Sequence, residues 1–427
     1  MKLLIKNGHV VSPENNLDAA VDILIDGSKI SKIGKNLKDN VDSTIDALGK
    51  IVMPGIVDMH VHLREPGRED KETIASGTLA AAHGGITSVL PMANTLIAID
   101  CVENVRLLKN IIAKSATANV FLAAAITKGR EGKEITNIAR LKKEGVIAIS
   151  DDGSSVESDE VMLRALKKAK ETKMLVLCHC EDKALSQGGV VNLGYTSTKM
   201  GLRGISKESE YKRVKRDIEL AEKVGAAIHI THVSCYESVE IIAKAKARGV
   251  KVTADTAPHY FSLSEEDVWG YDANMKMNPP LRTKEDVSAI KQALKSGVID
   301  AIASDHAPHT ENEKEIEFER AEFGVIGLET MLSAGVTYLV GQNILDMNEL
   351  VKKMCCSPAK ILGVKKGVLD IGYDADIAII SKDKEWLVKK ECFVSKSKNS
   401  AFLGKSLKGV VDQTILAGKV VYTNANK

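Results

Sequence analysis

Short apolar runs alternate with longer stretches of helical periodicity from about residue 51 to residue 364. Segments such as 157–173 and 206–224 place apolar residues three and four positions apart between charged ones, which predicts amphipathic helices. Eight apolar runs are separated in this way: 55–62, 86–91, 120–126, 146–150, 175–179, 228–232, 250–255 and 301–305. Eight strands alternating with helices predict an α/β fold, a (β/α)₈ TIM barrel.

The two ends of the chain have a different pattern. Residues 1–50 and 365–427 contain short runs of strand-forming residues separated by glycine and charged turns. We therefore expect both termini to pair into one small β-domain, a β-sandwich, beside a hydrolase barrel over 51–364.

Composition narrows the functional classes. The chain has 427 residues, 44% of them hydrophobic, and its 59 basic and 57 acidic residues leave a formal net charge of +2. Nothing in this balance calls for nucleic acid or an anionic membrane as a partner. The apolar start is too short for a signal peptide, and no run of about 18 apolar residues is present. Seven scattered cysteines fit a reducing cytoplasm. A homo-oligomer is expected only because homo-oligomers are common among soluble proteins.

Polar side chains end most of the eight runs. These residues are His62, Asp151 just past its run, His179, His232 and Asp305. The carboxyl ends of barrel strands form the active-site face, so we expect the five to meet at one mouth.

The first run contains the pattern His-x-His. Asp58, His60 and His62 alternate with apolar residues, so they share one face of a strand, and the two imidazoles can bind one metal ion. Asp58 would lie deeper and orient a ligand histidine. A lone His-x-His is weak support, because either histidine can be an ordinary core residue.

The later runs supply the rest of a two-metal site. His179 and His232 are each more often structural when taken alone, but together with His-x-His and Asp305 they fit a two-metal hydrolase. Two ions also need an anionic bridge, and we expect Asp151 to provide it. A solvated Asp-Asp-Gly turn at 151–153 is the alternative.

Several motifs resemble those of the dihydroorotase family, within the amidohydrolase superfamily. The two most specific are DMHVHLREPG at 58–67 and ASDHAPH at 303–309. Others appear in the expected order between and after them: PMANT at 91–95, DDG at 151–153, HCED at 179–182, THVS at 231–234, KMNPPLR at 276–282, FGVIGLET at 323–330 and GYDADI at 372–377. The resemblance covers almost the whole chain.

This resemblance implies reversible hydrolysis of dihydroorotate to N-carbamoyl-L-aspartate in pyrimidine biosynthesis. It implies two Zn²⁺ ions per chain, held by His60, His62, Asp151, His179, His232 and Asp305. It also implies that Arg64, Asn94 and His309 hold the substrate carboxylate and that Asn278 contacts the ring edge. A metal lowers the pKa of bound water to about 7, and Asp305 would act as general acid and base for the resulting hydroxide.

One departure separates this chain from many relatives of that superfamily. Hydantoinases and allantoinases bridge the metals with a carbamylated lysine on strand four, and residues 145–150 (GVIAIS) contain no lysine. The sequence resembles the dihydroorotase branch in which an aspartate takes that place, and Asp151 matches it. A hydantoinase or allantoinase is the nearest alternative, against which the missing lysine argues, and a non-catalytic scaffold is the second. The charged segment 310–323 is either a lid or an ordinary solvated loop, and the sequence leaves both open.

Overall fold

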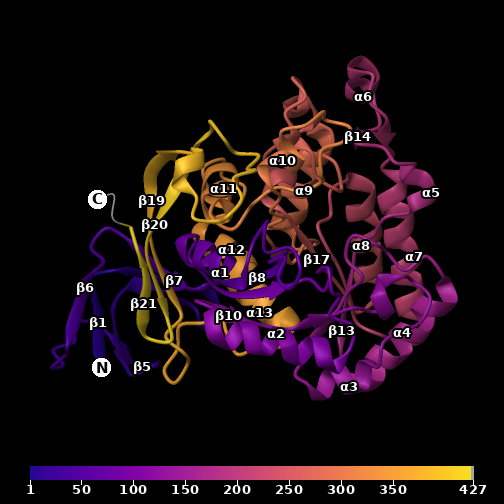
Figure 1. Cartoon of the computed structure of the whole chain (residues 1–427). Helices are drawn as coiled ribbons and strands as arrows, with labels where there is room; N and C mark the ends of the chain where they lie inside the picture. Colours follow the sequence, from indigo (N-terminus) through magenta and orange to yellow (C-terminus); the bar gives the residue numbers. More distant parts are fainter. Residues whose placement is uncertain (425–427) are drawn as a thin grey trace.

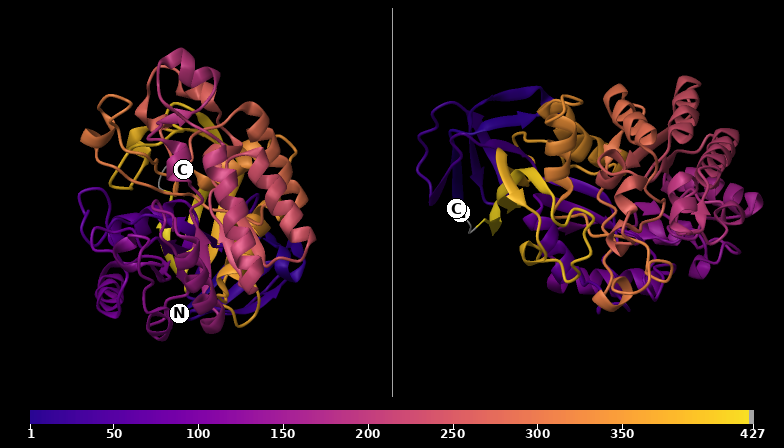
Figure 2. Two further views of the ribbon diagram at one scale, coloured as in Figure 1. Left: turned by 90° about the vertical axis from the view of Figure 1, so that its right-hand side faces the viewer. Right: turned by 90° about the horizontal axis from the view of Figure 1, so that it is seen from above.

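The computed structural model describes residues 1–424. Its centre is a parallel barrel with helices on the outside (Figures 1 and 2). The barrel strands are β8 (Ile56–Val61), β9 (Ile86–Pro91), β10 (Asn119–Val120) with β11 (Ala123–Ala124), β12 (Ala148–Ile149), β13 (Leu175–Cys178), β16 (Ile228–Ile230), β17 (Val252–Thr256) and β18 (Ala301–Ile302). These lie inside or overlap the eight apolar runs, so the predicted barrel is confirmed.

Hydrogen bonds just beyond the assigned strands close the barrel. Val61 and His306 form a parallel bridge, and the backbone N–H of His62 donates to the carbonyl of His306 at 2.8 Å. Between β9 and β11, the N–H of Phe121 donates to the carbonyl of Val89 at 2.9 Å. The carboxyl ends of the strands therefore share one rim.

Amphipathic helices cover the barrel. The longer ones are α1 (Ile74–His83), α2 (Val102–Ser115), α4 (Asp159–Thr172), α7 (Glu208–Val224), α8 (Tyr236–Ala247) and α9 (Lys284–Ser296). Shorter ones are α3 (Ile138–Lys143), α5 (Lys183–Ser186), α6 (Tyr195–Met200), α10 (Glu311–Lys314), α11 (Met331–Gly335), α12 (Met347–Val351) and α13 (Ser357–Leu362). Thr73 and Thr283 cap α1 and α9 with their hydroxyls, which explains why these helices begin where they do. No helix within residues 1–424 combines the length and apolarity that a membrane crossing needs.

The two termini build a pair of sheets on one side of the barrel, where Figure 1 places both chain ends. One sheet has the order β5 (Lys29–Gly34), β4 (Asp22–Asp26), β1 (Lys2–Lys6), β6 (Ser43–Asp46). The other has the order β21 (Lys419–Thr423), β20 (Ser406–Leu416), β19 (Ile377–Leu387), β7 (Ile51–Pro54), β2 (His9–Ser12), β3 (Leu17–Ala20). Residues between 3 and 52 and between 369 and 415 share a separate apolar cluster.

Two details differ from the expected boundaries. β7 pairs with β19 and β2 in the terminal sheet, although residues 51–54 were expected to belong to the barrel. Conversely, the C-terminal segment leaves the sheet after β19 and crosses to the barrel rim. There the Ser397 hydroxyl donates to the carbonyl of Lys71 at 2.8 Å, and Asn399 Nδ2 donates to the carbonyl of Gly324 at 3.1 Å. The division of the chain into two domains at 50/51 and 364/365 stays a prediction.

Candidate metal centre and active site

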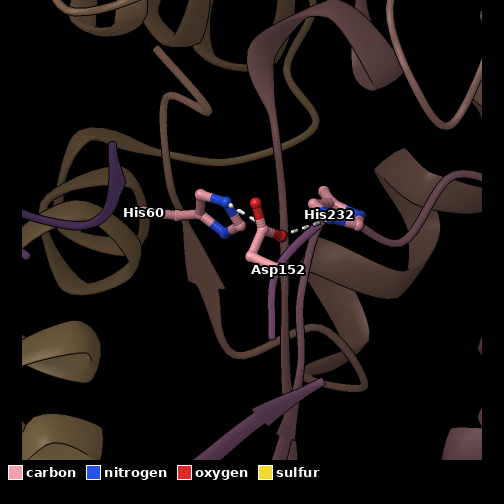
Figure 3. A group of neighbouring side chains, drawn as sticks. All are labelled: His60, Asp152 and His232. Carbon is pink, nitrogen blue, oxygen red and sulfur yellow. Dashed lines mark ion pairs between the residues drawn. The ribbon is translucent and has the colours of Figure 1, made fainter. Parts of the chain in front are cut away.

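Four histidines and two aspartates meet at the rim, each from a different strand end except for the first pair. His60 and His62 lie at the end of β8, Asp152 follows β12, and the others follow β13, β16 and β18: His179, His232 and Asp305. All six are buried. Two triads have ligand atoms within 4.8 Å of one another, namely His60, Asp152 and His232 (Figure 3) and His60, His62 and Asp305. The structure therefore brings these histidines and Asp305 together at one mouth, as the sequence predicts.

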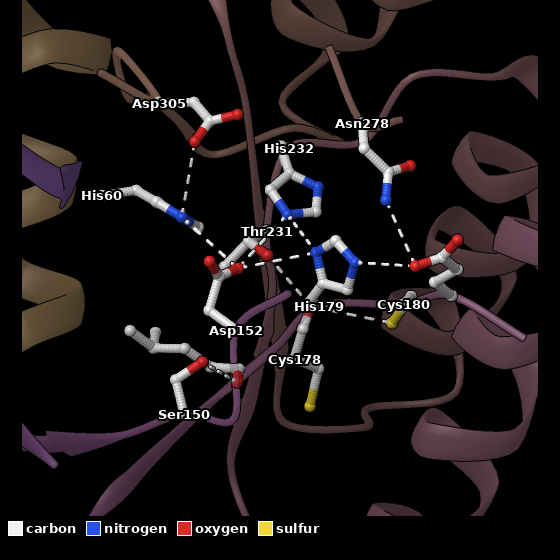
Figure 4. Close-up of polar contacts among 12 residues, drawn as sticks. His60, Ser150, Asp152, Cys178, His179, Cys180, Thr231, His232, Asn278 and Asp305 are labelled. Carbon is white, nitrogen blue, oxygen red and sulfur yellow. Dashed lines mark hydrogen bonds and ion pairs between the residues drawn. The ribbon is translucent and has the colours of Figure 1, made fainter. Parts of the chain in front are cut away.

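The carboxylate of Asp152 lies against all four imidazoles of the cluster, three of which, His60, His179 and His232, appear in Figure 4. Its Oδ1 lies 3.4 Å from His60 Nε2, 3.5 Å from His179 Nδ1 and 3.6 Å from His232 Nε2. Its Oδ2 lies 3.5 Å from His62 Nε2. Asp152 is thus placed as a bridge between the two triads.

The expectation for Asp151 is corrected by this geometry. The Asp151 carboxylate turns to the neighbouring strand end, where Oδ1 accepts from the N–H groups of Ile126 and Thr127 at 2.8 and 3.1 Å. Its Oδ2 accepts from the Thr127 hydroxyl. A turn begins at Asp152, and with Asp151 held by residues 126 and 127 it is Asp152 that faces the histidines. The alternative of a solvated turn is also wrong, since both aspartates are buried.

The donor set fits a metal ion. Within residues 1–424, His60 Nε2 and Asp152 Oδ1 are buried atoms without a hydrogen-bond partner, which is costly unless a cation satisfies them. Burial alone would lower the pKa of a histidine, yet the carboxylate of Asp152 raises the pKa of His60 to about 9 and that of His179 to about 10. The site is therefore short of positive charge.

A second layer of carboxylates orients this cluster. Glu181 Oε2 lies 3.4 Å from His179 Nε2, which leaves His179 Nδ1 facing Asp152. Asp255 Oδ1 accepts from the backbone N–H of His232 at 2.6 Å. Asp58 accepts from the N–H groups of His60 and Ser304, so it ties strand ends together and does not orient an imidazole. Glu181 was missed because nothing in its spacing separates it from surface acids, whereas Asp255 ends the apolar run 250–255 and could have been found by the signal that selected Asp305.

A cavity of about 780 Å³ opens over the cluster. The four residues that the resemblance assigned to the substrate all line it: Arg64, Asn94, Asn278 and His309. Asn94 Oδ1 lies 2.9 Å from His62 Nδ1, and its Nδ2 donates to Asp152 at 3.3 Å. Asn278 Nδ2 donates to Glu181 at 3.2 Å. The structure thus brings these four residues to the rim, and their substrate contacts stay predictions.

One wall of this cavity is strongly cationic. Arg64 Nε donates to the carbonyl of Pro308 at 3.1 Å, and Arg64 Nη2 lies 3.2 Å from His309 Nε2. Lys71 and Arg68 line the same wall, and their charges are offset by Glu313 at 3.0 and 2.7 Å. Burial lowers the pKa of Arg64 to about 10, so the guanidinium is still charged at neutral pH. This wall suits an anionic ligand.

The segment after β18 forms the rest of the wall. Lys276 Nζ donates to the carbonyls of Phe318, Glu319 and Ala321 at 2.9, 2.9 and 2.6 Å. Lys314 Nζ donates to the carbonyls of Glu322 and Gly324 at 2.8 and 3.0 Å. Both lysines are buried. Lys276 therefore fastens residues 318–321 from another loop of the rim, and Lys314 holds the segment together from within, which is unlike an ordinary solvated loop.

These features define a class: a metal-dependent hydrolase built on a (β/α)₈ barrel, with its ligands at the carboxyl ends of the strands. Comparison with known proteins agrees. The Dihydro-orotase-like family model matches residues 49–238. The chain is 51% identical to the dihydroorotase of Elusimicrobium minutum, over 99% of this chain and 98% of that one. It is 49% identical to that of Geobacter metallireducens, over 99% and 100%.

The chain belongs to the dihydroorotase family. Among solved structures it is similar to the L-hydantoinase (dihydropyrimidinase) of Arthrobacter aurescens, with a TM-score of 0.90 and 26% identity over 99% of this chain and 96% of that one. The barrel with its terminal β-domain is thus shared with cyclic-amide hydrolases, whereas the higher sequence identity lies with dihydroorotases.

Proposed function

We propose that this protein catalyses the reversible hydrolysis of dihydroorotate to N-carbamoyl-L-aspartate, a reaction of pyrimidine biosynthesis. The names of its relatives support this activity. The observation that carries the proposal is the meeting of two features in one cavity: a metal-ligand cluster around Asp152 and Asp305, and a cationic wall around Arg64. The first suits hydrolysis of an amide, and the second suits a ring that bears a carboxylate.

We propose two Zn²⁺ ions per chain. Imidazole nitrogens and carboxylate oxygens are ligands that zinc accepts, and the two triads share His60. His60, His62 and Asp305 would hold one ion, His179 and His232 the other, with Asp152 between them. A bound metal would supply a nucleophilic hydroxide at neutral pH and polarise the amide carbonyl.

The side chains of the chain itself would position the substrate and move the proton. Arg64, Asn94 and His309 would hold the substrate carboxylate, and Asn278 the ring edge. Asp305 lines the cavity with its Oδ1 3.2 Å from His62 Nε2. Although burial acts in the opposite direction, the neighbouring histidines lower the pKa of Asp305, so its carboxylate is ionised at neutral pH. It can therefore accept a proton from the attacking water and return it to the leaving ring nitrogen.

Replacing Asp305 tests this role. The Asp305→Ala variant should lose turnover by a factor of at least about 10², because it lacks the only proton carrier in this proposal, while it still binds the substrate analogue orotate. Asp300→Ala, at a partly exposed aspartate that pairs with Lys246 at the opposite end of β18, is the matched control. Retained turnover in Asp305→Ala would contradict the proposed role of this residue.

A hydantoinase-type cyclic amidase is the second candidate, because the similar solved structures include hydantoinases. The absence of a lysine at 145–150 and the cationic wall at Arg64 favour dihydroorotate. Parallel assays with dihydroorotate, hydantoin and allantoin would separate the candidates. Preference for an uncharged ring would overturn our choice, and no turnover of any of the three by metal-loaded protein would favour a non-catalytic scaffold.

We also propose that the protein acts in the cytoplasm and as a homo-oligomer, with a small-molecule substrate and neither nucleic acid nor membrane as a partner. All seven cysteines are free thiols, which suits a reducing compartment. Sedimentation of the purified protein would test the oligomer, and a monomer at all concentrations would refute it.

A further inference from the structure

The imidazole of His309 is held from both of its nitrogens. Nε2 lies 2.8 Å from the carbonyl oxygen of Phe323 and 3.2 Å from Arg64 Nη2. Nδ1 lies 3.1 Å from Lys71 Nζ. The side chains of Lys71 and His309 are both almost fully buried, with relative exposures of 7% and 5%.

These contacts decide where the proton of His309 resides. A carbonyl oxygen only accepts hydrogen bonds, so Nε2 carries the proton that is donated to Phe323 at 2.8 Å. Arg64 is also a donor, so its more distant Nη2 makes no hydrogen bond to Nε2 and keeps its N–H groups for an anion. An ammonium group only donates, so Nδ1 presents its lone pair to Lys71. A doubly protonated ring would place a third positive charge beside Arg64 and Lys71. Accordingly, burial and these two cations lower the pKa of His309 to about 2.

One acidic group competes for the ring. Glu313 Oε2 lies 3.6 Å from His309 Nδ1, which is too far for a hydrogen bond. That oxygen already accepts from the N–H and the hydroxyl of Thr310, both at 3.0 Å. The other oxygen of Glu313 lies 3.0 Å from Lys71 Nζ. Lys71 therefore separates Glu313 from the imidazole.

We propose that Lys71 is a positioning residue that fixes His309 as the neutral imidazole with its proton on Nε2. This positioning role rests on the proposed function, in which His309 binds the carboxylate of the substrate. Nε2 lies beside the guanidinium of Arg64, so its N–H can be shared between the carbonyl of Phe323 and an anion that Arg64 also binds. Without Lys71, the nearest polar partner of Nδ1 is Glu313, and the ring turns to donate its proton there.

Two measurements on one variant test the proposal. In the metal-loaded wild-type protein, nitrogen NMR of labelled histidine should show an unprotonated Nδ1 and a protonated Nε2 for His309, assigned with His309→Asn. In Lys71→Met, Nδ1 should become protonated. KM for dihydroorotate should rise about tenfold or more with little change in kcat, because one buried hydrogen bond to the carboxylate is lost.

Matched variants distinguish a positioning role of Lys71 from a mere loss of its charge or of the fold. Lys71→Arg should restore both the Nε2 proton and KM, since a guanidinium also donates to Nδ1. The double variant Lys71→Met with Glu313→Gln should recover the Nε2 proton, because the competing carboxylate is gone. Lys390→Met, at an exposed lysine paired with Glu311, should leave both readouts unchanged.

The outcomes are distinguishable. An unprotonated Nδ1 in Lys71→Met would overturn the proposal, whatever KM does, and so would an unchanged KM. If the wild-type protein does not turn over dihydroorotate, the proposed function fails, but the NMR measurement still decides whether Lys71 sets the state of His309.

Discussion

The two adjacent aspartates should fail in different ways when each is changed to asparagine. Asp152 is surrounded by four imidazoles at 3.4–3.6 Å, whereas Asp151 accepts two backbone N–H groups and a hydroxyl from residues 126 and 127. Asp152→Asn removes a negative charge from the cluster without changing its shape. We therefore expect it to lose metal, whereas Asp151→Asn should chiefly lose stability.

The magnitudes follow from these contacts. In Asp151→Asn the two N–H bonds to the remaining oxygen become neutral, and the Thr127 hydroxyl loses its acceptor; at about 1 kcal/mol each, the free energy of unfolding should fall by about 2–3 kcal/mol. Asp152→Asn removes one ionised metal ligand. Changing a residue that only orients a ligand typically weakens metal binding 10–100-fold, so this variant should bind metal at least about 10–100-fold more weakly.

The assays are metal content per chain after dialysis at a fixed free zinc concentration, and urea unfolding of each variant. Asp217→Asn, at another buried aspartate outside the cluster, controls for the loss of a buried charge. The reasoning would be refuted if Asp151→Asn lost metal while Asp152→Asn kept the full wild-type content.

Two further predictions concern the rim and the metal-free cluster. Lys314→Met leaves the carbonyl of Glu322 without its Lys314 donor and that of Gly324 with Asn399 alone, so the free energy of unfolding should fall by about 1–2 kcal/mol. Limited proteolysis should then begin to cut within 315–324, and an unchanged cleavage pattern would count against a fastened wall. The second prediction concerns chelator-treated protein. There the folded-state pKa values of His60 and His179, about 9 and 10, exceed the unfolded value of 6.5. Protonation of the two histidines therefore stabilises the fold fully below pH 6.5, and this stabilisation is lost as the pH rises through 9 to 10. Urea unfolding between pH 6.5 and 10 should show this loss in wild type and a smaller one in Asp152→Asn, and equal losses would contradict it.

Much of the fold follows from the sequence because each barrel strand is a short apolar run and each covering helix has a charged face. The helix expected over 157–173 is observed as Asp159–Thr172, and that over 206–224 as Glu208–Val224. The pairing of β7 (Ile51–Pro54) with the terminal sheet does not follow from the sequence, because a fully buried run has the same pattern in a barrel and in a sandwich. The crossing of residues 395–399 to the rim could not be predicted, since loops carry no periodicity.

The candidate site was predictable to the extent that strand direction determines it. His60, His62, His179, His232 and Asp305 are at or just past strand ends, so parallel strands had to bring them to one rim. Asp151 and Asp152 are past the end of β12, where alternation no longer fixes which side chain faces inward. Contacts with the neighbouring strand end determine the orientation: the N–H groups of residues 126 and 127 hold the Asp151 carboxylate, and Arg130 Nη2 contacts the carbonyl of Asp152. These contacts join separate strands, so no local pattern reveals them.

The charged segment after β18 shows how composition can mislead about mobility. Its charge density is that of a solvated loop, yet Lys314 is 6% exposed and binds the loop backbone, and Lys276 does the same from the other side. An ammonium group buried among carbonyls can leave only if those carbonyls lose their donor, so each lysine resists opening of the loop. The carbonyl of Phe323 is thereby held against His309, and the anion-binding wall exists before any substrate arrives. Binding to a preformed wall needs little ordering of side chains, which is why we expect changes at Lys71 and Lys314 to act chiefly on KM, and changes at Asp305 on kcat.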